Sequence, residues 1–224
     1  MMLQCISLCI SQTLVLPQLV CPKASAQTDF ALPALCSTFW KSQMCKSTQS
    51  PSAALAVLTN AIDGILDNAR DTDVSAVRAA IQQAFRSGVW LPEAQRTPGE
   101  ESYARHVLHS DPDRRYTVLA LVWKEGQASP VHAHHSWCAY SVVSGELFEE
   151  RFSYDAACHG AVAANSGLKG PGDGGCGRAG LDQIHRIRNR RSETAISVHV
   201  YGVPATELRH GVNNVLPLLE PTTI

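Results

Sequence analysis

The sequence lacks a long apolar run, a net charge of one sign and an ordered cysteine pattern. No stretch of its 224 residues stays apolar for long enough to cross a bilayer, so no membrane segment is expected. The formal net charge is −1 and the basic residues are scattered, which argues against nucleic acid as a partner. Eight cysteines occur without CxxC pairs, which favours a reducing, cytoplasmic location over a disulfide-stabilised secreted protein.

Residues 1–49 also lack a sustained apolar period, and they are rich in Ser, Gln and Cys. An apolar stretch at residues 14–20 is followed by Ala24-Ser-Ala26, which resembles a signal-peptidase site. No Lys or Arg precedes the apolar stretch, however, as a signal peptide would require. We therefore predict a disordered extension or an overlong translation start, with a targeting segment as the alternative. Residues 50–224 are long enough for one domain.

Two helices and then several strands are predicted for this domain. Apolar residues recur with helical spacing from residue 52 to about residue 69, and Asp73 can cap a second helix, so helices occupy about residues 50–90. Apolar alternation then predicts strands at residues 103–108, 116–123, 136–143, 147–152 and 195–200.

This order of elements indicates a mainly β (α+β) fold. Short strands separated by turns are typical of an antiparallel β-barrel or sandwich, here at about residues 100–205. Residues 156–180 contain eight glycines and are predicted to form a loop with one irregular strand.

Three histidines are candidate metal ligands. His132 and His134 are two residues apart, so on a strand they point to the same face, whereas His135 points to the other. His185 lies beyond the glycine-rich stretch and could return to the first pair only through a barrel or sandwich. Neutral imidazoles suit zinc, copper, iron and nickel, so three histidines alone do not name the metal.

The spacing around these histidines resembles the two motifs of the cupin superfamily. Five residues separate Gly126 from the first histidine and Gly145 closes the motif, but Cys138 stands where the family usually has its ligand glutamate. The second motif ends in His, three residues and Asn, which His185 and Asn189 match.

A cupin that keeps three histidines without the glutamate resembles the thiol dioxygenases, namely cysteine dioxygenase and 3-mercaptopropionate dioxygenase. The strand residues Ser197, His199 and Tyr201 match a Ser-x-His-x-Tyr run of that family, and the similarity covers about residues 103–202. The resemblance implies a cupin-type antiparallel β-barrel, or jelly roll, preceded by N-terminal helices. It also implies one Fe(II) per chain, held by His132, His134 and His185.

The same resemblance implies the reaction and its partners. The three residues Ser197, His199 and Tyr201 alternate on one strand face and would form a hydrogen-bond relay that ends near the iron. A small-molecule thiol would be oxidised by O2 to a sulfinic acid, in a monomer or weak homo-oligomer.

Arg105 indicates the substrate. It matches the position where cysteine dioxygenases carry a carboxylate-binding arginine and the 3-mercaptopropionate enzymes often carry glutamine. A guanidinium binds a carboxylate through two parallel hydrogen bonds, so L-cysteine is the predicted substrate and 3-mercaptopropionate the alternative. Arg178 is either a second carboxylate contact or a loop charge.

Trp137 and Cys138 are predicted to line the substrate pocket, and for each a place in the core is the alternative. In mammalian cysteine dioxygenases, a cysteine in this region forms a thioether crosslink with the tyrosine that Tyr201 matches. Here the spacing from His134 to Cys138 is one residue shorter than in the mammalian pattern, which argues against the crosslink.

Two further function classes stay open. A cupin isomerase or hydrolase with zinc or manganese would act without oxygen, although such cupins generally keep the glutamate that Cys138 replaces. A non-catalytic cupin module would bind a ligand or act as a sensor, with the metal absent or structural.

Overall fold

A computed structural model describes residues 51–68, 70–208 and 211–219, so the extension predicted at residues 1–49 lies outside the described residues. Its helices are α1 (Pro51–Asp67) and α2 (Val74–Ala84), followed by a 3-10 turn (Glu93–Gln95). Its strands are β1 (Ala104–Ser110), β2 (Thr117–Trp123), β3 (His132–His134), β4 (Cys138–Ser144), β5 (Leu147–Asp155), β6 (Gly160–Lys169), β7 (Gly174–Gly177), β8 (Gly180–Arg188), β9 (Ala195–Tyr201) and β10 (Asn213–Val215). Within these described ranges, no helix is long and apolar enough to cross a membrane.

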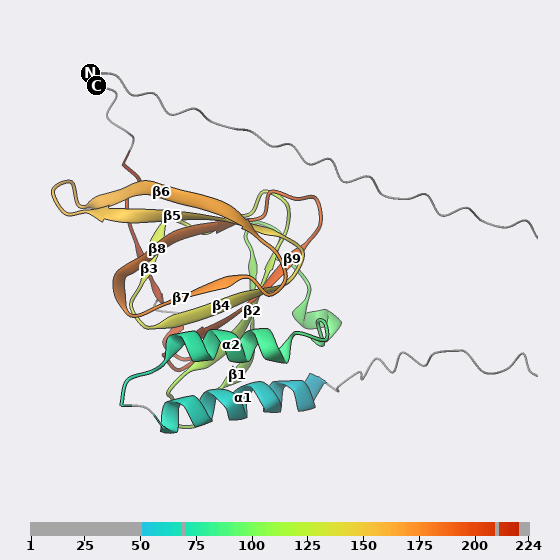
Figure 1. The fold of residues 1–224 in the computed structure, drawn as a ribbon. Helices are drawn as coiled ribbons and strands as arrows, with labels where there is room; N and C mark the ends of the chain where they lie inside the picture. The colour runs from blue at the N-terminus through green and yellow to red at the C-terminus, as the bar shows by residue number, and fades with distance from the viewer. Residues whose placement is uncertain (1–50, 69, 209–210, 220–224) are drawn as a thin grey trace, which may run out of the picture. The chain divides into compact units, whose positions relative to one another are not determined.

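The strands form two five-stranded sheets, in which every strand pair is antiparallel. One sheet has the order β1-β2-β9-β4-β7 and the other the order β10-β3-β8-β5-β6. Figure 1 shows the sheets face to face, with α2 against the outer face of the first sheet and α1 beyond it. This arrangement confirms the prediction of a mainly β, cupin-type barrel preceded by two helices.

The predicted helices form because each has one apolar face to bury. The Asp73 carboxylate accepts hydrogen bonds from the backbone N–H groups of Ser75 and Ala76, which satisfies two free donors at the start of α2. Val77 and Ile81 are fully buried on the same side of this helix. They belong to a cluster that includes one face of β2 and β9, so the helices cover the outer side of the first sheet.

Strand β2 is apolar from Val118 to its end because both of its faces are buried. Val118 and Ala120 face the helices, whereas Leu119, Leu121 and Trp123 belong to the separate cluster inside the barrel. Alternate residues of β2 thus pack into two different hydrophobic clusters, and the cluster inside the barrel surrounds the candidate site.

The glycine-rich region differs from the prediction. Instead of a loop with one irregular strand, residues 156–180 contain the whole of two strands, β6 and β7. Most of β6 is exposed on both faces, so its sequence shows no alternation of apolar and polar residues. In β7 the glycines permit close contact with β4, because a Cβ atom at Gly174 would lie 2.0 Å from the carbonyl oxygen of Tyr140.

Gly145, in the turn between β4 and β5, allows a test of how the cupin-like motif supports the barrel. Its φ is +68°, and an added Cβ would lie 2.9 Å from both Ala195 Cα and the Thr194 carbonyl oxygen. Gly126 has a φ of +79°, but a Cβ atom added there would have no other atom within 4 Å. Gly126→Ala should therefore cost only the left-handed strain, about 1–2 kcal/mol. Gly145→Ala should cost a further ~1–3 kcal/mol through overpacking. Urea unfolding of metal-free protein measures both values, and equal losses would contradict the assigned contact.

Candidate metal centre

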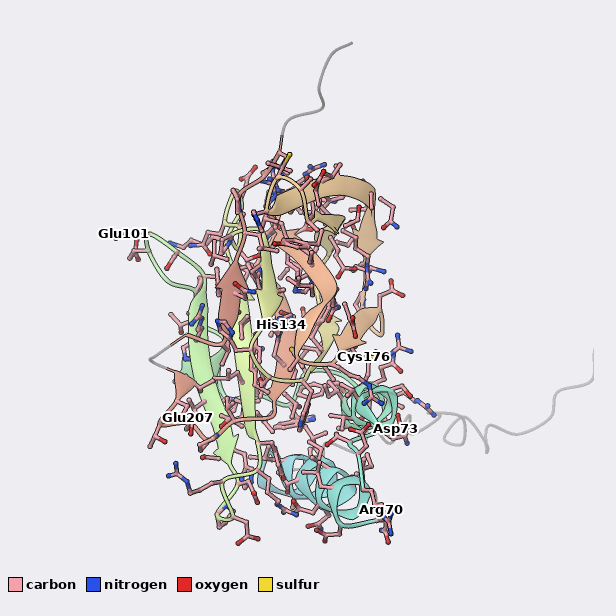
Figure 2. All side chains as sticks on the ribbon, turned by 90° about the vertical axis from the view of Figure 1, so that its left-hand side faces the viewer. Arg70, Asp73, Glu101, His134, Cys176 and Glu207 are labelled. Carbon is pink, nitrogen blue, oxygen red and sulfur yellow. The ribbon has the colours of Figure 1, made fainter. Side chains whose placement is uncertain are left out.

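Three imidazoles converge inside the barrel. His132 and His134 lie on β3, and His132 pairs directly with His185 on the neighbouring strand β8. One nitrogen from each ring can be chosen so that all three lie within 4.8 Å of one another, and each residue is at most 4% exposed. Figure 2 shows His134 in the interior among the strands. The structure therefore brings together the three histidines singled out by their spacing.

The local electrostatics favour neutral rings. Burial, together with the neighbouring His185, lowers the pKa of His132 to about 3 and that of His134 to about 2. A neutral imidazole keeps one nitrogen lone pair free, which is the state that binds a metal ion.

Hydrogen bonds orient two of the three rings. The His132 Nδ1 lies 2.9 Å from the carbonyl oxygen of Pro130, and the His185 Nδ1 lies 2.9 Å from Oε1 of Glu149. Carbonyl and carboxylate oxygens only accept, so both Nδ1 atoms donate, which leaves the Nε2 atom of each ring as the one that can face a metal ion. The buried Nδ1 of His134 has no hydrogen-bond partner among the described residues. Three buried, converging imidazoles form a donor set that fits a transition-metal ion.

A hydrogen-bonded chain runs along β9 beside the three histidines. The Trp123 Nε1–H donates to Ser197 Oγ at 3.0 Å, and Ser197 Oγ lies 2.9 Å from His199 Nε2. His199 Nδ1 lies 3.4 Å from the Tyr201 hydroxyl, and the Tyr201 ring centroid is 6.0 Å from that of His134. The predicted Ser-His-Tyr series thus lines up and approaches the metal centre, whereas Trp123 was missed.

Burial controls the protonation of this chain. It lowers the pKa of His199 well below the usual range, with a further contribution from His185, so the ring is neutral. It raises the pKa of Tyr201 well above its usual range, so the phenol keeps its proton. The chain can therefore pass a proton without holding a permanent charge.

A cavity of about 280 Å³ adjoins Tyr201 and contains Arg105 as its one charged lining residue. The remaining lining residues are apolar: Val107, Leu119, Leu121, Ala205, Leu208 and Val212. Arg105 Nη2 donates to the Tyr103 hydroxyl at 2.8 Å, and the guanidinium carbon lies 5.3 Å from the centroid of that ring. Tyr103 was missed, although its position two residues before Arg105 on an extended segment was a usable signal.

Trp137 lies in the core, which is the alternative considered for it, and neither Trp137 nor Cys138 is among the residues that line the cavity of Arg105. Trp137 packs with the helix-side core and against Gly202, where an added Cβ would lie 2.2 Å from the indole Nε1. Its neighbour Cys138 points the other way, into the inner cluster, because successive strand residues face opposite sides.

Cys138 and Tyr201 are direct cross-strand partners in the pairing of β4 with β9. Cys138 is 1% exposed and is a free thiol, and burial raises its pKa although a hydrogen bond with Tyr201 acts in the opposite direction. The shorter spacing from His134 therefore does not separate the two side chains.

Arg178 lies away from the cavity of Arg105. Its guanidinium pairs with Asp71, its side chain is 63% exposed, and it lines a different cavity near the start of α2. Of the two roles considered for Arg178, this position favours the loop charge over the second carboxylate contact.

Comparison with known proteins adds a family match. The sequence profile described as cysteine dioxygenase type I matches residues 44–210. Among solved structures, the chain resembles the protein TT1209 from Thermus thermophilus, with 21% identity over 50% of this chain and 96% of that one and a TM-score of 0.39. It also resembles a conserved Klebsiella pneumoniae protein with a double-stranded β-helix domain, with 19% identity over 52% of this chain and 90% of that one and a TM-score of 0.39.

Proposed function

The chain belongs to the cysteine dioxygenase type I family, and from this we propose that it is an iron-dependent thiol dioxygenase that oxidises L-cysteine with O2 to cysteine sulfinic acid. The observation that carries the proposal is the convergence of His132, His134 and His185, together with Tyr201, whose ring lies near His134 and lines a cavity that contains a single guanidinium. Among the described residues, the group that could hold a metal contains histidines only. We assign the catalytic domain to residues 50–224, with one Fe(II) per chain.

The three imidazoles would hold the iron. When bound, Fe(II) would offer open positions to the substrate thiolate and amine and to O2, and it would lower the pKa of the thiol. The apolar interior around the site excludes bulk water, which limits side reactions of the thiol.

Arg105 would bind the carboxylate of the substrate at the far side of the cavity. The hydrogen bond and ring contact with Tyr103 hold the guanidinium in place, so its remaining N–H groups can form two parallel bonds to a carboxylate. Binding at both ends fixes the sulfur near the histidines and reduces the entropy cost of the reaction.

The residues of β9 would hold and move a proton at the Tyr201 hydroxyl. The indole N–H of Trp123 only donates, so Ser197 Oγ accepts there and can give its own proton to His199 Nε2. In this arrangement His199 donates from Nδ1 to the Tyr201 oxygen, and the Tyr201 O–H is left to donate toward the substrate.

Oxygen uptake by Fe(II)-loaded protein with L-cysteine tests the proposal. We expect cysteine sulfinate as the product, with both oxygen atoms derived from labelled O2 in mass spectrometry. Turnover of 3-mercaptopropionate without turnover of cysteine would change the substrate assignment. Turnover of a substrate without O2 would indicate the isomerase or hydrolase class, and intact thiols would indicate a binding module.

A further inference from the structure

Glu149 is a buried carboxylate in direct contact with one of the three histidines. It lies on β5, beside β8, and is 2% exposed. Its Oε1 lies 2.9 Å from Nδ1 of His185, and an ion buried at this depth persists only when it is well paired. The contact with His185 is therefore the first candidate for the function of this buried carboxylate.

Two cations hold the other oxygen of this carboxylate. Arg151 Nε lies 3.2 Å and Lys169 Nζ 3.7 Å from Oε2, so Oε1 is left for His185. A carboxylate oxygen is a stronger acceptor for an imidazole N–H than a carbonyl oxygen.

The three histidines differ in this respect. The Nδ1 of His132 donates to the neutral carbonyl of Pro130, and that of His134 has no partner among the described residues. His185 alone is anchored by a charged group, and it is also the one histidine that comes from β8 rather than β3.

We propose that Glu149 is a positioning residue of the metal centre: by accepting the Nδ1 proton of His185, it fixes the ring so that Nε2 faces the ion. This inference rests on the proposed function, because it requires that the three histidines bind a metal. The carboxylate also adds a negative charge next to the three histidines. Cys138 stands where cupins usually have a glutamate ligand. In this chain Glu149 on β5 places a carboxylate near the metal centre without binding the ion itself.

Fe(II) affinity measured without oxygen, by competition with a chromophoric chelator, tests this role. Outer partners of ligating histidines typically contribute about 10- to 100-fold to metal affinity, so Glu149→Gln should weaken binding by that factor. The d–d absorption of Co(II)-substituted protein should shift in the same variant, because the orientation of His185 changes.

Glu150→Gln is the matched control. Glu150 neighbours Glu149 on the same strand but faces the other side, where Arg186 binds both of its carboxylate oxygens at 2.8 Å. Its replacement removes an equal charge and should leave Fe(II) affinity and the Co(II) spectrum unchanged. Equal losses in the two variants would overturn the proposal, since they would indicate a general charge effect.

Glu149→Asp covers the case in which Glu149→Gln does not fold. It keeps a charge beside Arg151 and Lys169 but shortens the reach to His185, and it should also bind Fe(II) more weakly than the wild type. Wild-type affinity in both Glu149 variants, or in Glu149→Asp alone if the other does not fold, would overturn the positioning role. His132→Ala distinguishes failure of the positioning role of Glu149 from failure of the proposed metal centre. If His132→Ala binds Fe(II) as well as the wild type, the metal centre itself is misassigned.

Discussion

Replacing His185 with alanine is expected to remove iron binding and thiol oxidation together. Loss of an outer partner already costs about 10- to 100-fold in metal affinity, so loss of a ligand should cost on the order of 1,000-fold or more. The two histidines of β3 would remain, but β8 would no longer contribute a ligand to the site. Iron content after anaerobic loading and oxygen uptake with L-cysteine measure the two effects.

His135→Ala is the control for this prediction. His135 follows His134 directly, but its side chain is exposed on the opposite face, and its backbone N–H bonds to Val212 regardless of the side chain. It should bind iron and turn over like the wild type. Thermal unfolding of the metal-free proteins shows whether His185→Ala is folded. A folded His185→Ala protein that keeps stoichiometric iron would contradict the assignment.

Replacing Arg105 with methionine is expected to reduce kcat/KM for L-cysteine by roughly 100- to 1,000-fold, which corresponds to the loss of two hydrogen bonds to a charged carboxylate. Methionine keeps much of the side-chain volume and removes the guanidinium. The loss should fall mainly on KM, because the carboxylate is bound in the ground state as well as in the transition state. Steady-state kinetics on the iron-loaded variant measure it.

Cysteamine, which lacks the carboxylate, shows whether the loss is specific. Its turnover should change little in Arg105→Met, because it has no group for the guanidinium to bind. Arg178→Met is the matched control, since Arg178 pairs with Asp71 outside this cavity and should leave cysteine kinetics unchanged. Equal losses for cysteine and cysteamine would mean that Arg105 supports the fold of the site rather than recognising the substrate.

Features that depend on neighbouring residues could be predicted from the sequence. Helix α2 follows from an N-cap and one apolar face, and the shared face of His132 and His134 follows from strand alternation. The cupin-like spacing then identified His185 as their partner, which the pairing of β3 with β8 agrees with. In each case the signal lies within a few residues or in a motif of fixed spacing.

Features that depend on strand register could not be predicted in the same way. Trp137 and Cys138 are neighbours in sequence, yet only the position of the helices and the opposite sheet shows that Trp137 faces outward and Cys138 inward. The spacing from His134 argued against a crosslink between Cys138 and Tyr201, whereas the pairing of β4 with β9 sets the two residues opposite each other.

The sequence by itself determined the order of helices and strands, the three histidines, Arg105 and the Ser-His-Tyr series, because local periodicity and motif spacing are written along the chain. Only the tertiary structure decided which groups surround them. Trp123 donates a hydrogen bond to Ser197, Tyr103 accepts one from Arg105, and Glu149 reaches His185 from 36 residues away along the chain. Such contacts depend on which strands pair and in what register, and these are set by burial across the whole barrel rather than by neighbouring residues.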